Sequence, residues 1–265
     1  TRNADYVAQW TADEDTAYTV EYYYEGNGAY PETATSSVKR SGTTDTEASV
    51  TAEDKKPNSA GYVFDESAEN ILKGTIAGDG SLVLKVYFKQ QFTVTYEPGT
   101  HGTFPSQKKE NLDYGTATPG FEGETTGDAG YAFAGWAPEV AETVTGNATY
   151  TAQWKANEDT KYTVEYYYQN EDGSYPTSTN MKREDRGTTD TRADVTDGDK
   201  TPAEAGYVFD ATNGSNVLSG TIAGNGSLVL KVYFKLQFTV TYKPGTQGTF
   251  EDQKTENLDY GTETP

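Results

Sequence analysis

The stretch GTIAGDGSLVLKVYFKQQF at residues 74–92 returns almost unchanged as GTIAGNGSLVLKVYFKLQF at residues 220–238. Each copy contains a Gly-Asp-Gly or Gly-Asn-Gly turn, because Gly adopts positive φ without a Cβ clash and Asp or Asn tolerates it. Residues 82–89 follow with apolar side chains at alternate positions, which predicts a strand. Another strand is predicted to begin at Phe92 and at Phe238. An internal repeat of this kind predicts a tandem array of small β-rich modules, elongated and joined with almost no slack.

The composition excludes several classes of function. Acidic residues outnumber basic ones by 41 to 21, and the net charge is −20. Such a charge excludes electrostatic binding of nucleic acid and argues against docking on anionic lipid. The chain has no cysteine, so it forms no disulfide and no thiolate metal site. No apolar run approaches the ~18 residues of a membrane span, so we expect no membrane insertion.

The repeat divides the chain into segments built from two kinds of module, termed A and B. They are a C-terminal fragment of module B at residues 1–10, a linker at 11–16, the first module A at 17–90, a complete module B at 91–154, a linker at 155–160, the second module A at 161–236, and an N-terminal fragment of module B at 237–265. There is no initiator Met, signal peptide or sorting motif, so we expect a segment of a longer protein.

Alternation of apolar and polar residues locates individual strands within these segments. Strands are predicted at residues 1–10, 18–24, 61–65, 92–96, 131–136 and 147–154. Residues 51–56 (TAEDKK) predict at most one helical turn, with Thr51 as N-cap and Asp54 at the N3 position. The fold class is therefore β-rich, and α+β at most.

Short motifs in both modules resemble known repeats. Module A, with YTVEYYY, GYVFD and LSGTIAGNGSLVLKVYFK, resembles the MucBP-like (mucin-binding protein) repeat, with a longer Thr- and Asp-rich middle. Module B, with FTVTY, YAFAGW and ATYTAQW, is similar to the internalin-type B-repeat, also called the Listeria–Bacteroides repeat. The resemblance implies ubiquitin-like β-grasp folds on extracellular, cell-wall-anchored proteins of Gram-positive bacteria. It supplies no catalytic residues.

Two functions are compatible with these features. The first is a structural stalk or spacer of a bacterial cell-surface adhesin, which projects a distal domain from the cell wall. The alternative is direct binding of mucin or another host glycan by the A modules through exposed tyrosines. Anionic mucin would be repelled by the acidic chain, so that alternative requires neutral sugars.

Aromatic residues are the candidate ligand-binding side chains. Tyr23, Tyr87, Tyr167 and Tyr233 fall on the strand faces opposite the apolar stripes. A flat ring with a hydroxyl group stacks on sugars, but cross-strand pairing on a half-covered sheet face explains the same pattern. The tryptophans Trp10, Trp136 and Trp154 are instead predicted to lie in the core, because each ends a run of inward alternation.

An enzyme is not expected. The lone His101 is replaced by Gln247 in the second copy, so no chemistry repeated in each module can use it. The acidic runs at residues 13–15, 158–159 and 197–199 lack a calcium-binding loop pattern, and we expect solvated linkers, no metal and no cofactor.

Two further possibilities concern bonds within and between chains. Lys85 and Lys231 are candidates for an internal isopeptide crosslink, although strand lysines commonly extend along apolar surface to water. The partial B modules at residues 1–10 and 237–265 leave strand edges unpaired, which favours head-to-tail self-association.

Overall fold

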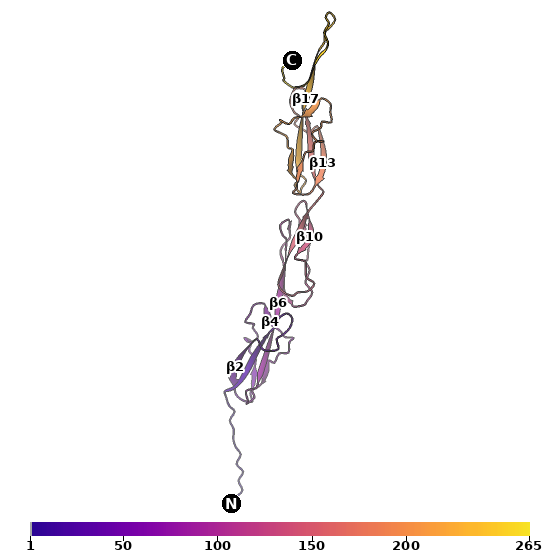
Figure 1. Ribbon diagram of the computed structural model, residues 1–265. Helices are drawn as coiled ribbons and strands as arrows, with labels where there is room; N and C mark the ends of the chain where they lie inside the picture. Colours follow the sequence, from indigo (N-terminus) through magenta and orange to yellow (C-terminus); the bar gives the residue numbers. More distant parts are fainter. Residues whose placement is uncertain (1) are drawn as a thin grey trace. The chain divides into compact units, whose positions relative to one another are not determined.

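The computed structural model describes residues 2–265, which form strands, turns and bends and contain no helix (Figure 1). The strands up to residue 113 are β1 (Thr16–Tyr24), β2 (Ser36–Gly42), β3 (Glu47–Ser49), β4 (Tyr62–Phe64), β5 (Lys73–Thr75), β6 (Val83–Glu97), β7 (Gly102–Thr103) and β8 (Gln107–Asp113). The others are β9 (Thr126–Gly127), β10 (Tyr131–Ala137), β11 (Ala148–Ala156), β12 (Thr160–Tyr168), β13 (Met181–Gly187), β14 (Arg192–Asp194), β15 (Tyr207–Phe209), β16 (Ser219–Thr221), β17 (Val229–Tyr242) and β18 (Gln253–Asp259). The predicted β-rich tandem array is confirmed.

The chain divides into two compact units. The first comprises Thr1–Glu97, Pro105–Gly123 and Trp136–Thr151, and the second comprises Pro98–Phe104, Glu124–Gly135 and Ala152–Pro265. Each unit therefore contains one module A together with part of the complete module B.

The sheet of the first module A has the order β2-β1-β6, with β4 on the far side of β6. β1 runs antiparallel to β2 and parallel to β6, and it pairs with β6 from Thr19↔Val83 to Tyr24↔Phe88. The second module A repeats this order as β13-β12-β17-β15, with the parallel pairs Thr163↔Val229 to Tyr168↔Phe234. Parallel strands need a long crossover, and here it contains turns and short strands instead of a helix.

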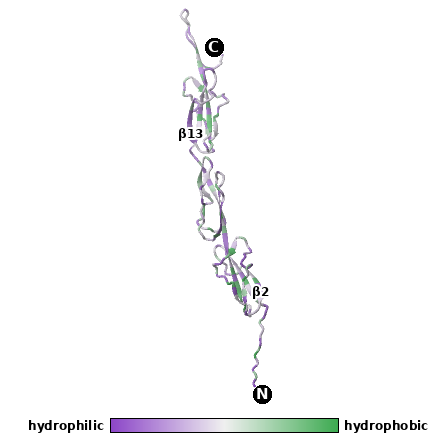
Figure 2. Cartoon of the chain, turned by 180° about the vertical axis from the view of Figure 1, so that it is seen from behind, coloured by the Kyte–Doolittle hydropathy of each residue, from purple (hydrophilic) through white to green (hydrophobic). Residues whose placement is uncertain are grey.

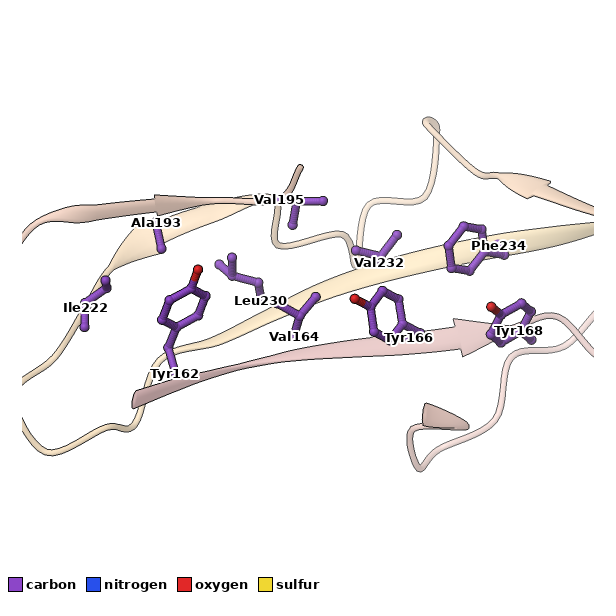
Figure 3. Close-up of a cluster of buried hydrophobic side chains, with 10 residues drawn as sticks. All are labelled: Tyr162, Val164, Tyr166, Tyr168, Ala193, Val195, Ile222, Leu230, Val232 and Phe234. Carbon is purple, nitrogen blue, oxygen red and sulfur yellow. The ribbon is translucent and has the colours of Figure 1, made fainter. Parts of the chain in front are cut away.

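The core of each module A lies along the parallel pair of strands. In the second module A, alternate side chains of β12 and β17 face the same interior, and residues from β14 and the segment after β16 cover them (Figure 3). Leu230, Val232 and Phe234 are fully buried there, as are Leu84, Val86 and Phe88 in the first module A. Hydrophobic residues are concentrated along these strands, and much of the remaining chain is hydrophilic (Figure 2). The apolar stripe recognised in the repeated stretch is therefore the core-facing one.

β6 runs from Val83 to Glu97 without interruption, and so it passes through the predicted module boundary between residues 90 and 91. Its first part pairs with β1 and β4 of module A, and its second part pairs with β8 and β11 of module B. β17 crosses the corresponding boundary between residues 236 and 237 in the same way. Two strands were predicted at each junction, and the structure has one.

Within module B, β6 lies between antiparallel β8 and parallel β11. One extra residue of β8 interrupts the register between Phe92 and Val94, and Asn111 nearby adopts a left-handed φ of 60°. β17 and β18 contain the same irregularity, with Asn257 at φ 62°. Asn tolerates this conformation better than most residues, which explains an Asn at both positions.

The segment predicted as a helical turn at residues 51–56 forms a series of turns. Its capping hydrogen bonds are nevertheless present, because the Asp54 backbone NH donates to Thr51 Oγ1 and Thr51 Oγ1 donates to Asp54 Oδ2. The predicted linker at residues 155–160 is also shorter than expected. β11 ends at Ala156 and β12 begins at Thr160, so only residues 157–159 are irregular.

Two of the three tryptophans, Trp136 and Trp154, pack within module B. Trp154 is half-buried, and its Nε1 donates to the Pro98 carbonyl at 2.6 Å. Its indole lies against Gly102, where an added Cβ would come within 2.0 Å of a ring atom. Trp136 is also half-buried, and its ring centroid lies 4.8 Å from that of Tyr96.

Trp10 is 92% exposed, so its predicted core position is wrong. The predicted strand at residues 1–10 is wrong as well, since residues 2–10 form no strand and Thr1 lies outside the described residues. The reason is the lack of a covering surface. Trp154 is covered by Pro98 and Gly102 of its own module B, whereas Trp10 is not covered by any part of the described chain, and alternation alone does not bury a side chain.

The contact between Trp154 and Gly102 predicts the effect of one methyl group. Gly102→Ala should destabilise module B by about 1–3 kcal/mol, because the indole must move to make room for the Cβ. Urea unfolding followed by tryptophan fluorescence measures this change. Gly120→Ala is the matched control, since nothing lies within 4 Å of a Cβ at that position. Equal unfolding midpoints for the two variants would contradict the packing described here.

Candidate functional site

The predicted tyrosines of the first module A lie together in one cluster on the outer face of the sheet. Tyr23 of β1 and Tyr87 of β6 are register partners, and their rings stack with centroids 4.6 Å apart. Tyr30 packs edge-on against Tyr87 at 4.9 Å, and Lys85 Nζ lies 5.6 Å from the Tyr23 ring centroid. We call these four residues the tyrosine cluster.

The second module A contains the same cluster. Tyr167 and Tyr233 stack at 4.6 Å, Tyr175 packs edge-on against Tyr233 at 5.1 Å, and Lys231 Nζ lies 5.8 Å from the Tyr167 centroid. Sequence reasoning missed Tyr30 and Tyr175 as members, although the Tyr-Pro pair that contains them occurs in both copies.

The predicted exposure of these tyrosines is wrong for half of them. Tyr23 is 5% exposed and Tyr167 is 6% exposed, because each lies beneath its stacked partner and a lysine. Tyr87 and Tyr233 are half-buried. Tyr87 lines an open hollow with Tyr30 and Lys85, and it offers a ligand one aromatic surface. Cross-strand pairing therefore accounts for the positions of Tyr23 and Tyr167.

Hydrogen bonds to carboxylates fix the buried rings. Tyr23 donates its hydroxyl to Glu21 Oε2 at 2.7 Å, and this bond, together with burial, raises the pKa of Tyr23 to about 12. Tyr30 donates to Asp65 Oδ2 at 2.7 Å, and burial followed by this bond raises the pKa of Tyr30 strongly. These hydroxyl groups stay protonated at neutral pH, so they serve as hydrogen-bond donors and not as bases.

A second polar constellation lies on the core side of the sheet. Asp54 is buried and accepts hydrogen bonds from Tyr22 Oη at 2.6 Å and from Thr51 N at 2.8 Å, and it forms a bidentate ion pair with Arg40. We call this arrangement the carboxylate latch, because it ties the turn at residues 51–56 to strands β1 and β2.

The second module A forms its latch with an arginine at a different position. Asp199 accepts from Tyr166 Oη at 2.6 Å and from Thr196 N at 2.8 Å, and Arg183 approaches it at 2.9 Å. Arg183 lies opposite Val164 in the register, whereas Arg40 lies opposite Tyr18, which is two positions further along the strand. The long arginine side chain reaches the equivalent carboxylate, Asp54 or Asp199, from either position.

The pKa of the aspartate is lowered in both carboxylate latches. Burial raises the pKa of Asp54, but the hydrogen bonds from Arg40, Tyr22 and Thr51 outweigh burial and hold the pKa of this carboxyl group well below its usual value. The pKa of Asp199 is lowered by the same balance. A buried carboxylate whose oxygens accept hydrogen bonds from several donors stabilises the fold and is poorly suited to proton transfer.

Apart from the buried Asp199, the other polar candidates lie at the surface. His101 is exposed and stacks on Tyr131 at 4.1 Å. In the acidic runs, Glu158 pairs with Lys155, Asp159 pairs with Arg186, and Asp199 belongs to a latch. Within residues 2–265, no group of three or more His, Cys, Asp or Glu side chains is arranged to hold a metal ion. The same residues contain no helix that is long and apolar enough to cross a membrane.

The chain matches no protein-family model and no curated protein, so the MucBP-like and internalin-type assignments stay predictions. Among solved structures it is similar to Streptococcal High Identity Repeats in Tandem (SHIRT) domains 3-4 from a cell surface protein. The identity is 16%, the TM-score is 0.19, and the match covers 53% of this chain and 98% of the other. A likeness this low carries no functional inference.

The carboxylate latches predict acid sensitivity of the fold. Unfolded Asp has a pKa near 3.8, and the folded values lie lower, so the stabilisation is complete above the unfolded pKa and is lost as the pH falls through the folded pKa. Asp54→Asn with Asp199→Asn should lower the stability at pH 7 by about 1–3 kcal/mol per module. The variant should also lose less stability than the wild type between pH 7 and pH 3.

Urea unfolding midpoints at both pH values provide the measurement. Glu53→Gln with Asp197→Asn is the control, because both side chains lie next to a latch and are exposed. Identical pH dependence in wild type and latch variant would show that other carboxylates cause the acid sensitivity.

Proposed function

We propose that this chain is a structural spacer segment of a bacterial cell-surface adhesin. The observation that carries the proposal is the continuous strand at each junction from module A to module B. β6 and β17 each belong to the sheets of two successive modules, so no flexible peptide separates these modules. A spacer needs such junctions, because a flexible hinge would let a distal domain fold back.

Polar contacts support the shared strand at both junctions. Lys89 Nζ lies 2.7 Å from Asp113 Oδ2 in the first unit, and Gln91 Nε2 donates to the same carboxylate. Lys235 and Asp259 form the equivalent pair in the second unit, with Gln237 again donating. One partly exposed ion pair adds less than about 1 kcal/mol, so its contribution is mainly to orientation.

An aromatic contact limits rotation about the strand. Gly28, in a turn of the first module A, has φ 78° and faces the ring of Tyr114 from module B, where an added Cβ would come within 2.5 Å. Gly173 and Tyr260 make the same contact in the second unit. The turn of module A therefore rests on the next module at a point away from the shared strand.

The chain's location follows from the same proposal. A spacer of this class works outside the cell, anchored to the wall of a Gram-positive bacterium. The net charge of −20 supports the spacer function, since like charges along the chain oppose collapse and aggregation. We propose no catalytic role, because neither the tyrosine cluster nor the latch combines a nucleophile with a base.

Small-angle X-ray scattering of the chain tests the spacer function. The expected radius of gyration is well above the ~18 Å of a compact 265-residue domain. Spin labels at Lys39→Cys and Lys108→Cys provide a local test, because the chain has no native cysteine. Their distance distribution should be narrow, and a Gly-Ser-Gly-Ser insertion after Gln90 should broaden it. The same insertion after Glu14 is the control and should leave the distribution unchanged.

A compact particle, or a broad distribution in the uninterrupted chain, would overturn the spacer proposal. Either result would show that the junctions bend despite the shared strand.

A second candidate function is binding of neutral glycans by the tyrosine clusters. The hollow beside Tyr87, lined also by Tyr30 and Lys85, supports it. With Tyr23 and Tyr167 buried, Tyr87 and Tyr233 are the predicted tyrosines on which a sugar can stack.

A glycan array decides whether this second function exists. Binding of neutral glycans should disappear in the Tyr87→Ala, Tyr233→Ala variant and persist in Tyr6→Ala, which changes an exposed tyrosine outside both clusters. No binding by the wild-type chain would eliminate this candidate and leave the spacer proposal intact.

A further inference from the structure

Three Asn-Gly pairs occur in the chain, each in a connection between two strands. They are Asn27-Gly28, Asn213-Gly214 and Asn225-Gly226. In an Asn-Gly pair the glycine backbone nitrogen can attack the carbonyl carbon of the asparagine side chain, because glycine has no Cβ to block the approach. Whether a pair reacts depends on how the fold holds that nitrogen and that side chain.

The fold restrains two of the three pairs. Asn225 Oδ1 accepts the backbone NH two residues ahead at 3.1 Å, and the Gly226 NH donates to the Ala223 carbonyl at 2.8 Å. Asn213 is half-buried, and its Oδ1 accepts the backbone NH two residues ahead at 2.9 Å. An asparagine side chain bound to the backbone in this way is kept from turning toward the neighbouring nitrogen.

The pair Asn27-Gly28 lacks these restraints. It occupies the two central positions of a hairpin turn, with φ of 52° and 78°, and Gly26 and Ala29 exchange backbone hydrogen bonds across it. Residues 26–29 are exposed. Among the described residues, none forms a hydrogen bond with the Asn27 side chain or with the Gly28 NH. Both reacting groups are therefore free to meet as the turn opens locally.

We propose that Asn27 is a site of spontaneous deamidation, with water as the co-reactant. The Gly28 nitrogen forms a bond to Asn27 Cγ, the bond from Cγ to Nδ2 breaks, and ammonia leaves with the proton of the Gly28 NH. The product is a cyclic imide, a succinimide. Water then opens this ring at one of its two carbonyl carbons. Cleavage of the bond from Cγ to the Gly28 nitrogen gives aspartate, and cleavage of the original peptide bond gives isoaspartate.

Isoaspartate is the product that changes the structure. Asp45 and Asp190 adopt φ of 64° and 62°, so an aspartate at position 27 keeps the turn. Isoaspartate adds a carbon atom to the backbone of a two-residue turn, whose length sets the strand register. Gly28 lies so close to the Tyr114 ring of module B that an added Cβ would come within 2.5 Å. The lengthened turn therefore shifts Gly28 on that ring and loosens the aromatic contact between modules A and B.

The second module A has no asparagine at this position. Asp172 stands there, and its Oδ1 accepts the Ser174 backbone NH at 2.9 Å and the Ser174 hydroxyl at 2.6 Å. The proposed deamidation is therefore confined to the junction between the first module A and module B.

Peptide mass spectrometry of the aged chain tests the proposal. The folded chain is incubated at mildly alkaline pH, digested and sequenced by fragmentation, and its isoaspartate is measured with an isoaspartyl methyltransferase. Asn27 should be converted to aspartate and isoaspartate. Asn213 and Asn225 should react roughly tenfold more slowly, since their hydrogen bonds must break first.

Two controls separate the effect of the fold from that of the sequence. Incubation in urea removes the turn contacts, so all three asparagines should then react at similar rates. Asn27→Gly removes the reacting side chain and suits a positive φ, so this variant should form no isoaspartate at position 27. Equal rates at Asn27 and Asn225 in the folded chain, or an Asn27 that stays intact until urea is added, would overturn the proposal.

The predicted loosening of the junction rests on the spacer proposal and has its own measurement. With spin labels at Lys39→Cys and Lys108→Cys, the aged chain should give a broader distance distribution than the fresh chain. The Asn27→Gly chain, aged in the same way, should keep the narrow distribution. A broad distribution in the fresh chain contradicts the spacer proposal, whereas an aged, deamidated chain as narrow as the fresh one contradicts the loosening alone.

Discussion

A single constraint organises this protein: one strand serves two sheets. β6 must present apolar residues to module A in its first part and to module B in its second, and it pairs with four other strands along its length. Neither module can shift its register without moving the other. This explains why residues 74–92 and 220–238 are nearly identical, since each of these positions is constrained by the packing within a module, at a junction or both.

The carboxylate latch shows how the two copies keep a structure while their sequences differ. β2 (SSVKRSG) and β13 (MKREDRG) have Arg40 and Arg183 at positions two residues apart in the register, yet both guanidinium groups reach the aspartate of the following turn. The fold requires a positive charge beside the aspartate, and the strand position that supplies this charge can differ. Variation in exposed strands is tolerated as long as a long cation stays within reach of Asp54 or Asp199.

The sequence predicted the parts of the fold that bury apolar residues at alternate positions. β1, the two halves of β6 and β11 follow that pattern, and so do β12 and the first part of β17, which are the copies of β1 and of the first part of β6. β2, β8, β13 and β18 were missed because they are polar and contain no fully buried residue, and their pairing depends on neighbours distant in sequence. Alternation also located the tyrosine cluster. It wrongly predicted that Tyr23 is exposed, because the stacked ring of Tyr87 covers Tyr23 on the outer face of the sheet.

The parallel pairing of β1 with β6 has a mechanical consequence. The chain enters the first module A through β1 and leaves through β6, and these strands lie side by side and point the same way. Tension applied between entry and exit therefore shears the whole hydrogen-bond ladder at once and does not peel it open one bond at a time. Module B is entered through β6 and left through parallel β11, and the second module A repeats the arrangement with β12 and β17. Every complete module is thus loaded in its more resistant direction.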